Sequence, residues 1–435
     1  MQHLTQDQIS EALFSSIDSL IEHREDFLVN PQTAFTRERK ISFRKTVLFP
    51  MLAGSDNVAN ELLDLFGEEG LPLPSSMIQR RNQIKPEAFQ NLFFSFTGKI
   101  PLFNTFNGYR LFSIDGTRLN LAYNPSDPFT HIQCIKGRRG INQIHLNLLY
   151  DPLNDTFNDL EIQGIHQVNE KTAFCRILDK RAKMNPEEKI IFLADRGYAS
   201  YNIFAHAIHN NQKFLIRVSE PFAKGMCQKD QHWLEGECFD EEILFHIGRR
   251  RTKQNLQLSN FHCIQTRGTY DFIEAKSDET DCLLLRVLKF PISEDSFEYI
   301  VTNLPKYAFS LNTIKKLYYL RWNEETAFRF LKYAGSMVHL HSLKWSLILQ
   351  EIYGKLTMYN FTSFLISLTG FEGKETSKHR YVINHTQAQK SCVSFLKGKV
   401  ENIVALILKY LVPVRPERKF TRNLRSQSAD TFTYR

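Results

Sequence analysis

Two aspartates stand in sequence contexts that suit metal-assisted chemistry. Asp115 and Asp195 each follow an apolar run typical of a buried strand and precede a glycine-containing turn, in "SIDGT" and "LADRGY". A carboxylate at the end of a strand is held rigidly while its oxygens stay accessible, and such oxygens suit Mg²⁺ or Mn²⁺. Taken singly, each aspartate would more often cap a turn than bind a metal. We assign Asp151 to capping, because the "PLND" that follows it is turn chemistry.

A third carboxylate lies in "YYLRWNEETAFRFLK", residues 318 to 332, which has the apolar spacing of an amphipathic helix. At about 100° per residue, one polar stripe about 60° wide gathers four side chains, with a fifth beside it. These five are Tyr318, Arg321, Glu325, Lys332 and, beside them, Arg329. The stripe is either a solvated face with ion pairs worth a few tenths of a kcal/mol each, or a surface on which the acid completes a metal site and the other groups hold phosphates. Spacing alone leaves both open. Glu324 falls off the stripe, and we interpret it as an ordinary solvated or ion-paired residue.

The elements that must position these residues form an α/β pattern. Apolar runs at "YRLFSIDG", "NQIHLNLLYD" and "TFNDLEIQG" predict three strands, the last two forming a hairpin. A helix near 169–183, the strand "KIIFLAD", the helix "SYNIFAHAIHNN" and the strand "KFLIRVS" follow. The order β-β-β-α-β-α-β predicts an α/β domain with a mixed sheet. Residues 221–300 break this rhythm with strand-like pieces and predict a β-rich insertion, and a helical pattern resumes at 312 and continues to about 370.

The first 95 residues have helical periodicity throughout. A linker "EEGLPLP" separates one predicted helix from "SSMIQRRNQIKPEAF", which carries Gln79, Arg80 and Arg81. Two helices around a Gly/Pro turn, the second bearing Gln and Arg, suit a helix-turn-helix reader of DNA. A plain helical bundle with surface arginines fits the same residues equally well.

Composition narrows the function classes. The 435 residues carry a net charge of +8, which fits either a polyanionic partner such as nucleic acid or a merely basic surface. The seven cysteines include no C-x-x-C pair, which argues against a zinc module and a disulfide framework. We see no signal peptide and no apolar run of about 18 residues, so we expect a soluble cytoplasmic protein without membrane contact.

The helical stretch matches the Y-(2)-R-(3)-E-(6)-K signature of a group of bacterial insertion-sequence transposases, with every spacing intact. "SIDGT" and "LADRGY" resemble the two aspartate motifs of that family, and "YIVTNLP" and "RPERKFTR" are similar to segments of its members. The resemblance implies an α/β ribonuclease-H-like core whose DDE triad is Asp115, Asp195 and Glu325. It also implies that the triad binds two Mg²⁺ (or Mn²⁺) ions, cuts DNA at transposon ends and joins the end to target DNA in a cut-and-paste reaction.

The same resemblance suggests how DNA would be held. Tyr318, Arg321 and Lys332 would grip phosphates near the cut, with Arg329 beside them. An aromatic residue of the insertion would stack a flipped base. The candidates are Trp233, Phe297 and Tyr299, although a core role is the commoner one for each. The implied partner is double-stranded DNA, both terminal inverted repeats and target. Family members act in paired-end complexes, so we expect a homodimer on DNA, in the bacterial cytoplasm at the nucleoid. Because a metal-bound nucleophile needs no histidine base, we interpret His206, His209, His339 and His341 as structural or surface residues.

The expected organisation has five segments. They are a helical DNA-binding domain (1–95), the first part of the ribonuclease-H-like core (96–220), the β-rich insertion (221–300), the second part of the core with the glutamate helix (301–375), and a C-terminal helical segment with a basic tail (376–435). Two other functions remain compatible with the residues. One is a metal-dependent nuclease on the same core, and the other is a domesticated DNA-binding protein without transposition activity.

Overall fold

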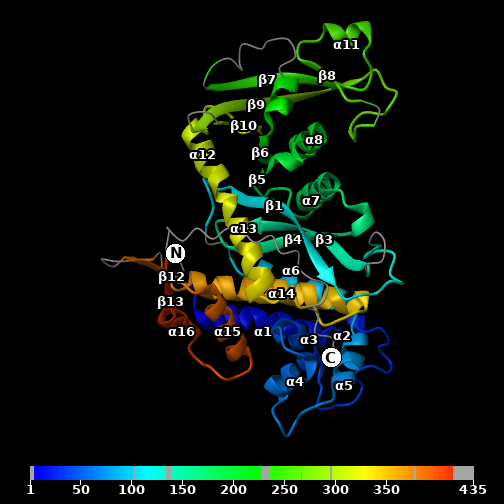
Figure 1. Cartoon of the computed structure of the whole chain (residues 1–435), viewed down its shortest axis with the longest axis vertical. Coiled ribbons are helices and arrows are strands. Elements are labelled where there is room, and N and C mark those ends of the chain that lie inside the picture. The colour runs from blue at the N-terminus through cyan, green and yellow to red at the C-terminus, as the bar shows by residue number, and fades with distance from the viewer. Residues whose placement is uncertain are drawn as a thin grey trace.

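A computed structural model describes residues 4–101, 104–133, 139–226, 236, 238–265, 267–293, 296–371, 373–375 and 379–414. A long sheet rises from a layer of helices that contains both the N-terminal and the C-terminal helices (Figure 1). Three further strands form a small separate sheet. The "RPERKFTR" segment of the predicted tail lies outside the described residues.

The large sheet has ten strands in the order β2-β3-β1-β5-β6-β10-β9-β7-β8, with β4 paired to β3. β1 is antiparallel to β3 and parallel to β5, and β5 is parallel to β6, so the sheet is mixed, as predicted. β3 and β4 form the predicted hairpin. The strands of this sheet are β1 (Arg110–Leu121), β2 (His131–Ile132), β3 (Ile141–Asp151), β4 (Thr156–Gly164), β5 (Ile190–Ala194), β6 (Lys213–Val218), β7 (Phe239–Gly248), β8 (Phe261–Cys263), β9 (Thr280–Ser293) and β10 (Ser296–Thr302).

Side chains from the central strands are buried on both faces of the sheet. Leu111 and Leu193 lie in a cluster with Leu317 of α12 (Leu311–Leu320), whereas Phe112 and Phe192 pack with the helices of the opposite face. Successive side chains of a strand point to opposite faces, and a strand covered on both faces therefore has a nearly continuous apolar sequence. The covering helices of the second face are α7 (Glu170–Met184) and α8 (Tyr201–His209). The strand order β4-β3-β1-β5-β6 with this helical cover is consistent with a ribonuclease-H-like core.

The strands between residues 239 and 302 extend the same sheet. β10 pairs antiparallel with β6, and β9 and β7 follow outward. Figure 1 shows these strands at the end of the molecule far from the helical layer, beside α11 (Lys253–Gln257). The strands of the segment that the sequence marks as β-rich therefore extend the edge of the large sheet.

The helical layer is built around α14 (Trp345–Ser367), which is buried along most of its length. α14 packs against α3 and α6 from the N-terminal region and α15 from the C-terminal region, and it shares one core cluster with β3 and β4. No helix among the described residues is long and apolar enough to cross a membrane. The other elements are α1 (Gln6–Glu22), α2 (Arg24–Phe27), α3 (Phe43–Leu52), α4 (Val58–Phe66), α5 (Pro74–Asn82), α6 (Glu87–Lys99), η1 (Ile165–Gln167), η2 (Arg196–Tyr198), α9 (Glu220–Met226), α13 (Trp322–Arg329), η3 (Phe330–Ala334), α15 (His385–Leu396), α16 (Ile403–Lys409), β11 (Lys374–Glu375), β12 (Arg380–Ile383) and β13 (Leu411–Pro413).

Candidate active site

Asp115 and Asp195 occupy equivalent positions on two neighbouring parallel strands. The paired register of β1 and β5 ends with Ile114 opposite Ala194, and each aspartate is the next residue of the chain; Asp115 continues β1, whereas Asp195 follows the end of β5 and caps η2. The prediction that the first strand ends at Asp115 is wrong, because β1 continues to Leu121 through its pairing with β3. The carboxylates nevertheless stand where the β1–β5 pairing stops. This is the edge of a parallel pair at which α/β proteins present functional side chains.

Each aspartate is fixed by a backbone contact and sits in a charged neighbourhood. One oxygen of Asp115 accepts a hydrogen bond from the Gly116 N–H at 2.8 Å, and one oxygen of Asp195 accepts from the Gly197 N–H at 2.8 Å. Burial raises the pKa of Asp115 to about 6. The Gly116 N–H opposes this shift, the negative charge of Asp195 adds to it, and Arg321 opposes it. The negative charge of Asp195 therefore reaches the Asp115 carboxyl.

A histidine–glutamate pair covers the backbone directly after Asp115. His145 Nε2 lies 3.0 Å from Glu170 Oε1, and His145 is buried. A Cβ added at Gly116 would overlap both of these side chains. A side chain at position 116 would therefore force the His145–Glu170 pair to move, and the glycine lets this pair approach the strand.

The signature stretch forms two helical segments and a final turn of different pitch. α12 ends at Leu320, α13 begins at Trp322, and Phe330–Ala334 form a π-helical turn. A π turn inserts an extra residue and is frequent at functional sites, so the ideal angle count fails for Lys332. Lys332 is half-buried in this turn. Burial lowers the pKa of Lys332, and the charge of Asp115 opposes that shift, which places the ammonium group within electrostatic reach of the first aspartate.

The predicted polar stripe is largely buried. Tyr318 and Arg321 are 4% and 6% exposed, so they are not part of a solvated face. Arg321 Nη2 lies 3.7 Å from Glu325 Oε1. The side chain of Glu325 is 41% exposed, and Arg329 is exposed. The structure thus brings Arg321 and Glu325 together and leaves Arg329 at the surface.

The structure contradicts the interpretation of Glu324 as a solvated or ion-paired residue. It is fully buried, and neither carboxylate oxygen has a hydrogen-bond partner among the described residues. Burial raises its pKa well above the usual range, and the charges of Asp115 and Asp195 raise it further, while the Ser113 hydroxyl and Arg321 oppose them. Glu324 could not be singled out from the sequence because it is one position off the family spacing. The only signal was the adjacent pair of glutamates.

Comparison with known protein families shows which family this chain belongs to. The family model described as "Transposase DDE domain" matches residues 106–361, which is more than half of the 435-residue chain. The chain belongs to the DDE transposase family. The match includes both aspartates and the signature stretch of this transposase.

Other comparisons are more distant. The cryo-EM structure of the piggyBac transposase synaptic complex with hairpin DNA aligns with 99% of this transposase and with 84% of its own chain. Identity is 10% and the TM-score is 0.44, a level at which two chains need not share a fold. None of the curated protein sequences compared with the transposase matches it.

Within the described part of the transposase, no three His, Cys, Asp or Glu side chains are grouped tightly enough to hold a metal ion by themselves. This finding is compatible with a Mg²⁺ site that uses the two aspartates. Mg²⁺ is usually bound through one or two carboxylates together with water and substrate phosphates, and rarely by an all-protein cage. Asp115 and Asp195, which directly follow the last paired residues of β1 and β5, are oxygen donors that fit a cation coordinated in part by substrate phosphates.

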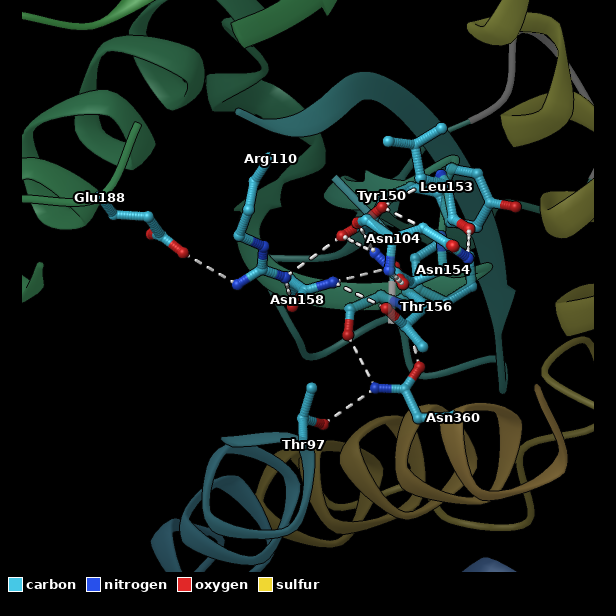
Figure 2. A network of polar contacts seen from close by, with 12 residues as sticks. Thr97, Asn104, Arg110, Tyr150, Leu153, Asn154, Thr156, Asn158, Glu188 and Asn360 are labelled. Atoms are coloured by element: carbon cyan, nitrogen blue, oxygen red, sulfur yellow. Dashed lines mark hydrogen bonds and ion pairs between the residues drawn. The ribbon is translucent and has the colours of Figure 1, made fainter. Parts of the chain in front are cut away.

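Asp151 is a structural residue of the transposase, as its turn chemistry predicts. It is fully buried, one oxygen accepts from the Leu153 N–H at 3.0 Å, and the other lies 3.3 Å from Arg110 Nη2. Arg110 also donates to Glu188 and to Asn158 (Figure 2). The four histidines named above likewise avoid the carboxylates of the site where contacts are described. For example, His206 bridges Asp179 and Asp271 at 2.9 Å each.

The three aromatic candidates for base stacking divide by position. Trp233 lies outside the described residues. Tyr299 is 6% exposed and belongs to the core cluster under α7 and α8, which is the core role that its residue type favours. The ring of Phe297 is half-buried against the same cluster, with the Lys289 ammonium 4.3 Å from its centroid.

Gln79, Arg80 and Arg81, the three residues predicted to contact DNA, lie in different environments. Arg81 is 2% exposed, and its guanidinium is 2.9 Å from Glu351 Oε1 and donates to the Leu347 carbonyl. This geometry does not support a DNA contact by Arg81. Gln79 and Arg80 instead line a cleft of about 680 Å³ between α5 and the segment before α3. Arg37, Arg39 and Lys40 line the same cleft and were not identified from the sequence.

Proposed function

We propose that this DDE transposase moves an insertion-sequence element of the Y-R-E-K signature group by a cut-and-paste reaction. The observation that carries the proposal is the placement of Asp115 and Asp195 directly beyond the last paired residues of β1 and β5. The two carboxylates there stand side by side where the β1–β5 pairing ends, and the charge of Asp195 reaches Asp115. Asp115, Asp195 and Glu325 form the proposed catalytic triad, and two Mg²⁺ or Mn²⁺ ions are the proposed cofactors.

Bound cations would lower the pKa of an attacking water and stabilise the leaving oxygen. Residues of the chain would orient the groups that take part in this chemistry. The aspartates are held by backbone N–H groups, so their oxygens are pre-oriented. Arg321, buried beside Glu325, orients that carboxylate. Lys332 would present its ammonium group to the scissile phosphate near Asp115.

The proposed reaction has two steps, and both take place at the same active site. Water attacks the phosphorus at the end of the element, and the strand breaks to give a free 3′-OH and a 5′-phosphate. The 3′-OH then attacks a target phosphodiester in line, so one P–O bond forms as another breaks. No residue of the chain becomes covalently attached to DNA. We infer that two copies act together on paired ends, each holding one end.

The cleft between α5 and the segment before α3 supports DNA binding by the N-terminal helices. Among the described residues, no carboxylate forms an ion pair with Arg37, Arg39, Lys40 or Arg80. Burial lowers the pKa of Arg80, and the like charge of Arg39 lowers it further. The Arg80 guanidinium also lies over the Phe35 ring, 4.7 Å from its centroid. Cations that repel one another in a cleft are stabilised by an anion, and a DNA backbone would supply phosphates to this cleft.

Substitution of Glu325 tests the proposal. Purified Glu325→Gln protein should bind DNA that carries the end of the element with the affinity of wild type, because the cleft is untouched. Mg²⁺-dependent cleavage and strand transfer should vanish, because the acid of the triad is lost. Arg321→Ala should slow cleavage and leave metal binding in place. Undiminished cleavage by Glu325→Gln would exclude this triad.

A further inference from the structure

The turn that carries Lys332 is wider than an ordinary helical turn. Phe330–Ala334 are π-helical, and the Gly335 N–H donates to the Phe330 carbonyl at 2.8 Å. The Val338 N–H donates to the Lys332 carbonyl at 3.2 Å, which also skips the α-helical spacing. Because π turns are rare, contacts from elsewhere in the fold are expected to favour this one over the ordinary α pitch.

Such a contact comes from the C-terminal region of the chain. The ring of Phe330 stacks on the imidazole of His385, with the ring centroids 4.4 Å apart and the planes inclined by 9°. The Arg329 guanidinium lies 5.7 Å from the Phe330 centroid. Helix α15, which begins at His385, packs on the π turn. The stacked ring of His385 therefore fixes where Phe330 lies.

Helix α15 is itself held firmly in the helical layer. Ala388 and Cys392 are buried in the core cluster that α15 shares with α14. The Gln389 side chain accepts a hydrogen bond from the Thr362 hydroxyl of α14 at 2.9 Å. The imidazole of His385 is thus presented to the π turn from an anchored element.

Lys332 depends on this turn for its direction. It is half-buried two residues after Phe330, and no carboxylate among the described residues forms an ion pair with it. Its ammonium group is therefore not oriented by an ion-pair partner of its own. If the turn relaxed to the α pitch, the side chains after Phe330 would rotate about the helix axis by up to about 100°, the angle of one residue.

We propose that His385 is a positioning residue for DNA cleavage, which stacks on Phe330 and so holds the π turn that directs Lys332. This inference rests on the proposed function, since it uses the contact of Lys332 with the scissile phosphate. His385 acts through Phe330 and Lys332 and touches no substrate. The C-terminal helical segment would in this way take part in the active site.

Single-turnover cleavage of DNA carrying the end of the element tests this role on the full chain. His385→Ala should lower the rate at saturating protein by about 10- to 100-fold, since a misplacement of about 1 Å can cost about 100-fold. The protein concentration that gives half of this rate should change less than about 2-fold, because the loss is not one of binding. His385→Phe, which keeps a flat ring against Phe330, should restore the rate to within about 3-fold of wild type.

His209→Ala is the matched control. The His209 ring lies 4.3 Å from the Phe272 ring, so this substitution removes a similar ring contact far from the π turn in sequence. It should leave the cleavage rate unchanged. His385→Leu, which keeps the bulk of the side chain without a flat ring, should cleave as slowly as His385→Ala and replaces it if the alanine variant does not fold.

A double-mutant cycle with Lys332→Ala shows whether His385 acts through the lysine. Adding His385→Ala to Lys332→Ala should slow cleavage by less than about 2-fold more, because residues that act as a unit are not additive. Additive losses, or a wild-type rate for His385→Ala beside a slow Lys332→Ala, would overturn this inference alone. A wild-type rate for Lys332→Ala would instead remove the proposed role of Lys332, and this inference with it.

Discussion

Neighbouring arginines of α5 have opposite environments. Arg81 is buried against α14, where its guanidinium pairs with Glu351 and donates hydrogen bonds to Gln350 and to the Leu347 carbonyl. Arg80 faces the cleft and hydrogen-bonds Gln83 at 3.1 Å. A sequence cannot distinguish two consecutive arginines of a short helix, because the distinction depends on which face α14 covers.

Exchanging each arginine for alanine should separate stability from DNA binding. Arg81→Ala should lower the free energy of unfolding by about 3 to 5 kcal/mol, because Glu351 is left buried without its partner. Arg80→Ala should fold normally and bind DNA more weakly, with the slope of log affinity against log salt reduced by about 1. Denaturant titration and salt-dependent fluorescence anisotropy measure the two effects. A stable Arg81→Ala protein, or an unchanged salt slope for Arg80→Ala, would contradict these roles.

Lys355 predicts a pH dependence of stability that is independent of the active site. Burial lowers its pKa to about 8, and its ammonium group donates to the Ala53 carbonyl at 3.0 Å. In the unfolded chain a lysine releases its proton only near about pH 10.4, so between these values the unfolded state binds more protons. Stability contributed by this group therefore rises as the pH rises through this window and is flat below it.

Lys355→Met should abolish this rise. Between pH 7.5 and pH 10, wild type should gain about 2 to 3 kcal/mol of unfolding free energy relative to the variant. Urea titrations of both proteins at the two pH values provide the measurement, and the difference cancels the titration of other groups. Parallel stability curves for the two proteins would show that Lys355 is not buried as a charge.

At the scale of elements, the core strands and helices were readable from the sequence and the signature helix was only partly so. The apolar runs of β1, β3, β4, β5 and β6 predict the mixed sheet, because strands covered on both faces need continuous apolar residues. The π turn at Phe330–Ala334 and the inward face of Glu324 were not predictable. Both depend on how α13 packs against β1, and a carboxylate at an inward position violates the periodicity from which faces are read.

One side chain joins α14 to the edge strand of the core. Asn360 accepts from the Phe157 N–H at 2.9 Å and donates to the Phe157 carbonyl at 2.7 Å and to Thr97 Oγ1 at 2.9 Å (Figure 2). It supplies β4 with the contacts that another strand would give at this position. Because all these groups are buried or nearly so, their loss leaves backbone polar groups unpaired.

Asn360→Ala should therefore lower the unfolding free energy by about 2 to 4 kcal/mol, from two unpaired backbone groups at about 1 to 2 kcal/mol each. Hydrogen exchange of the Phe157 amide should accelerate. Ser346→Ala, near the start of the same helix and only partly buried, is the control and should change stability by less than about 0.5 kcal/mol. An unaltered Phe157 exchange rate in Asn360→Ala would exclude this joint.

At the scale of the whole molecule, chain segments far apart in sequence meet in one helical layer. α1, α3 and α6 from the N-terminal region share a core with α14, α15 and α16. Gly354 of α14 lets α3 approach so closely that a Cβ there would lie 3.1 Å from the Met51 nitrogen. Helix α5, which lines the cleft, is joined to α14 through the buried ion pair of Arg81 with Glu351. This contact links the proposed DNA-binding cleft to the helix that follows the proposed catalytic stretch.

Joining of a transposon end to target DNA tests the central claim most directly. Purified wild-type protein, given Mg²⁺ and DNA with the inverted repeats that flank its gene, should release a 3′-OH at the end of the element and join it to a second DNA. Asp115→Asn should bind the same DNA and form neither product, because the carboxylate pair at the β1–β5 edge is broken. Cleaved or joined product from Asp115→Asn at the wild-type rate would contradict the account.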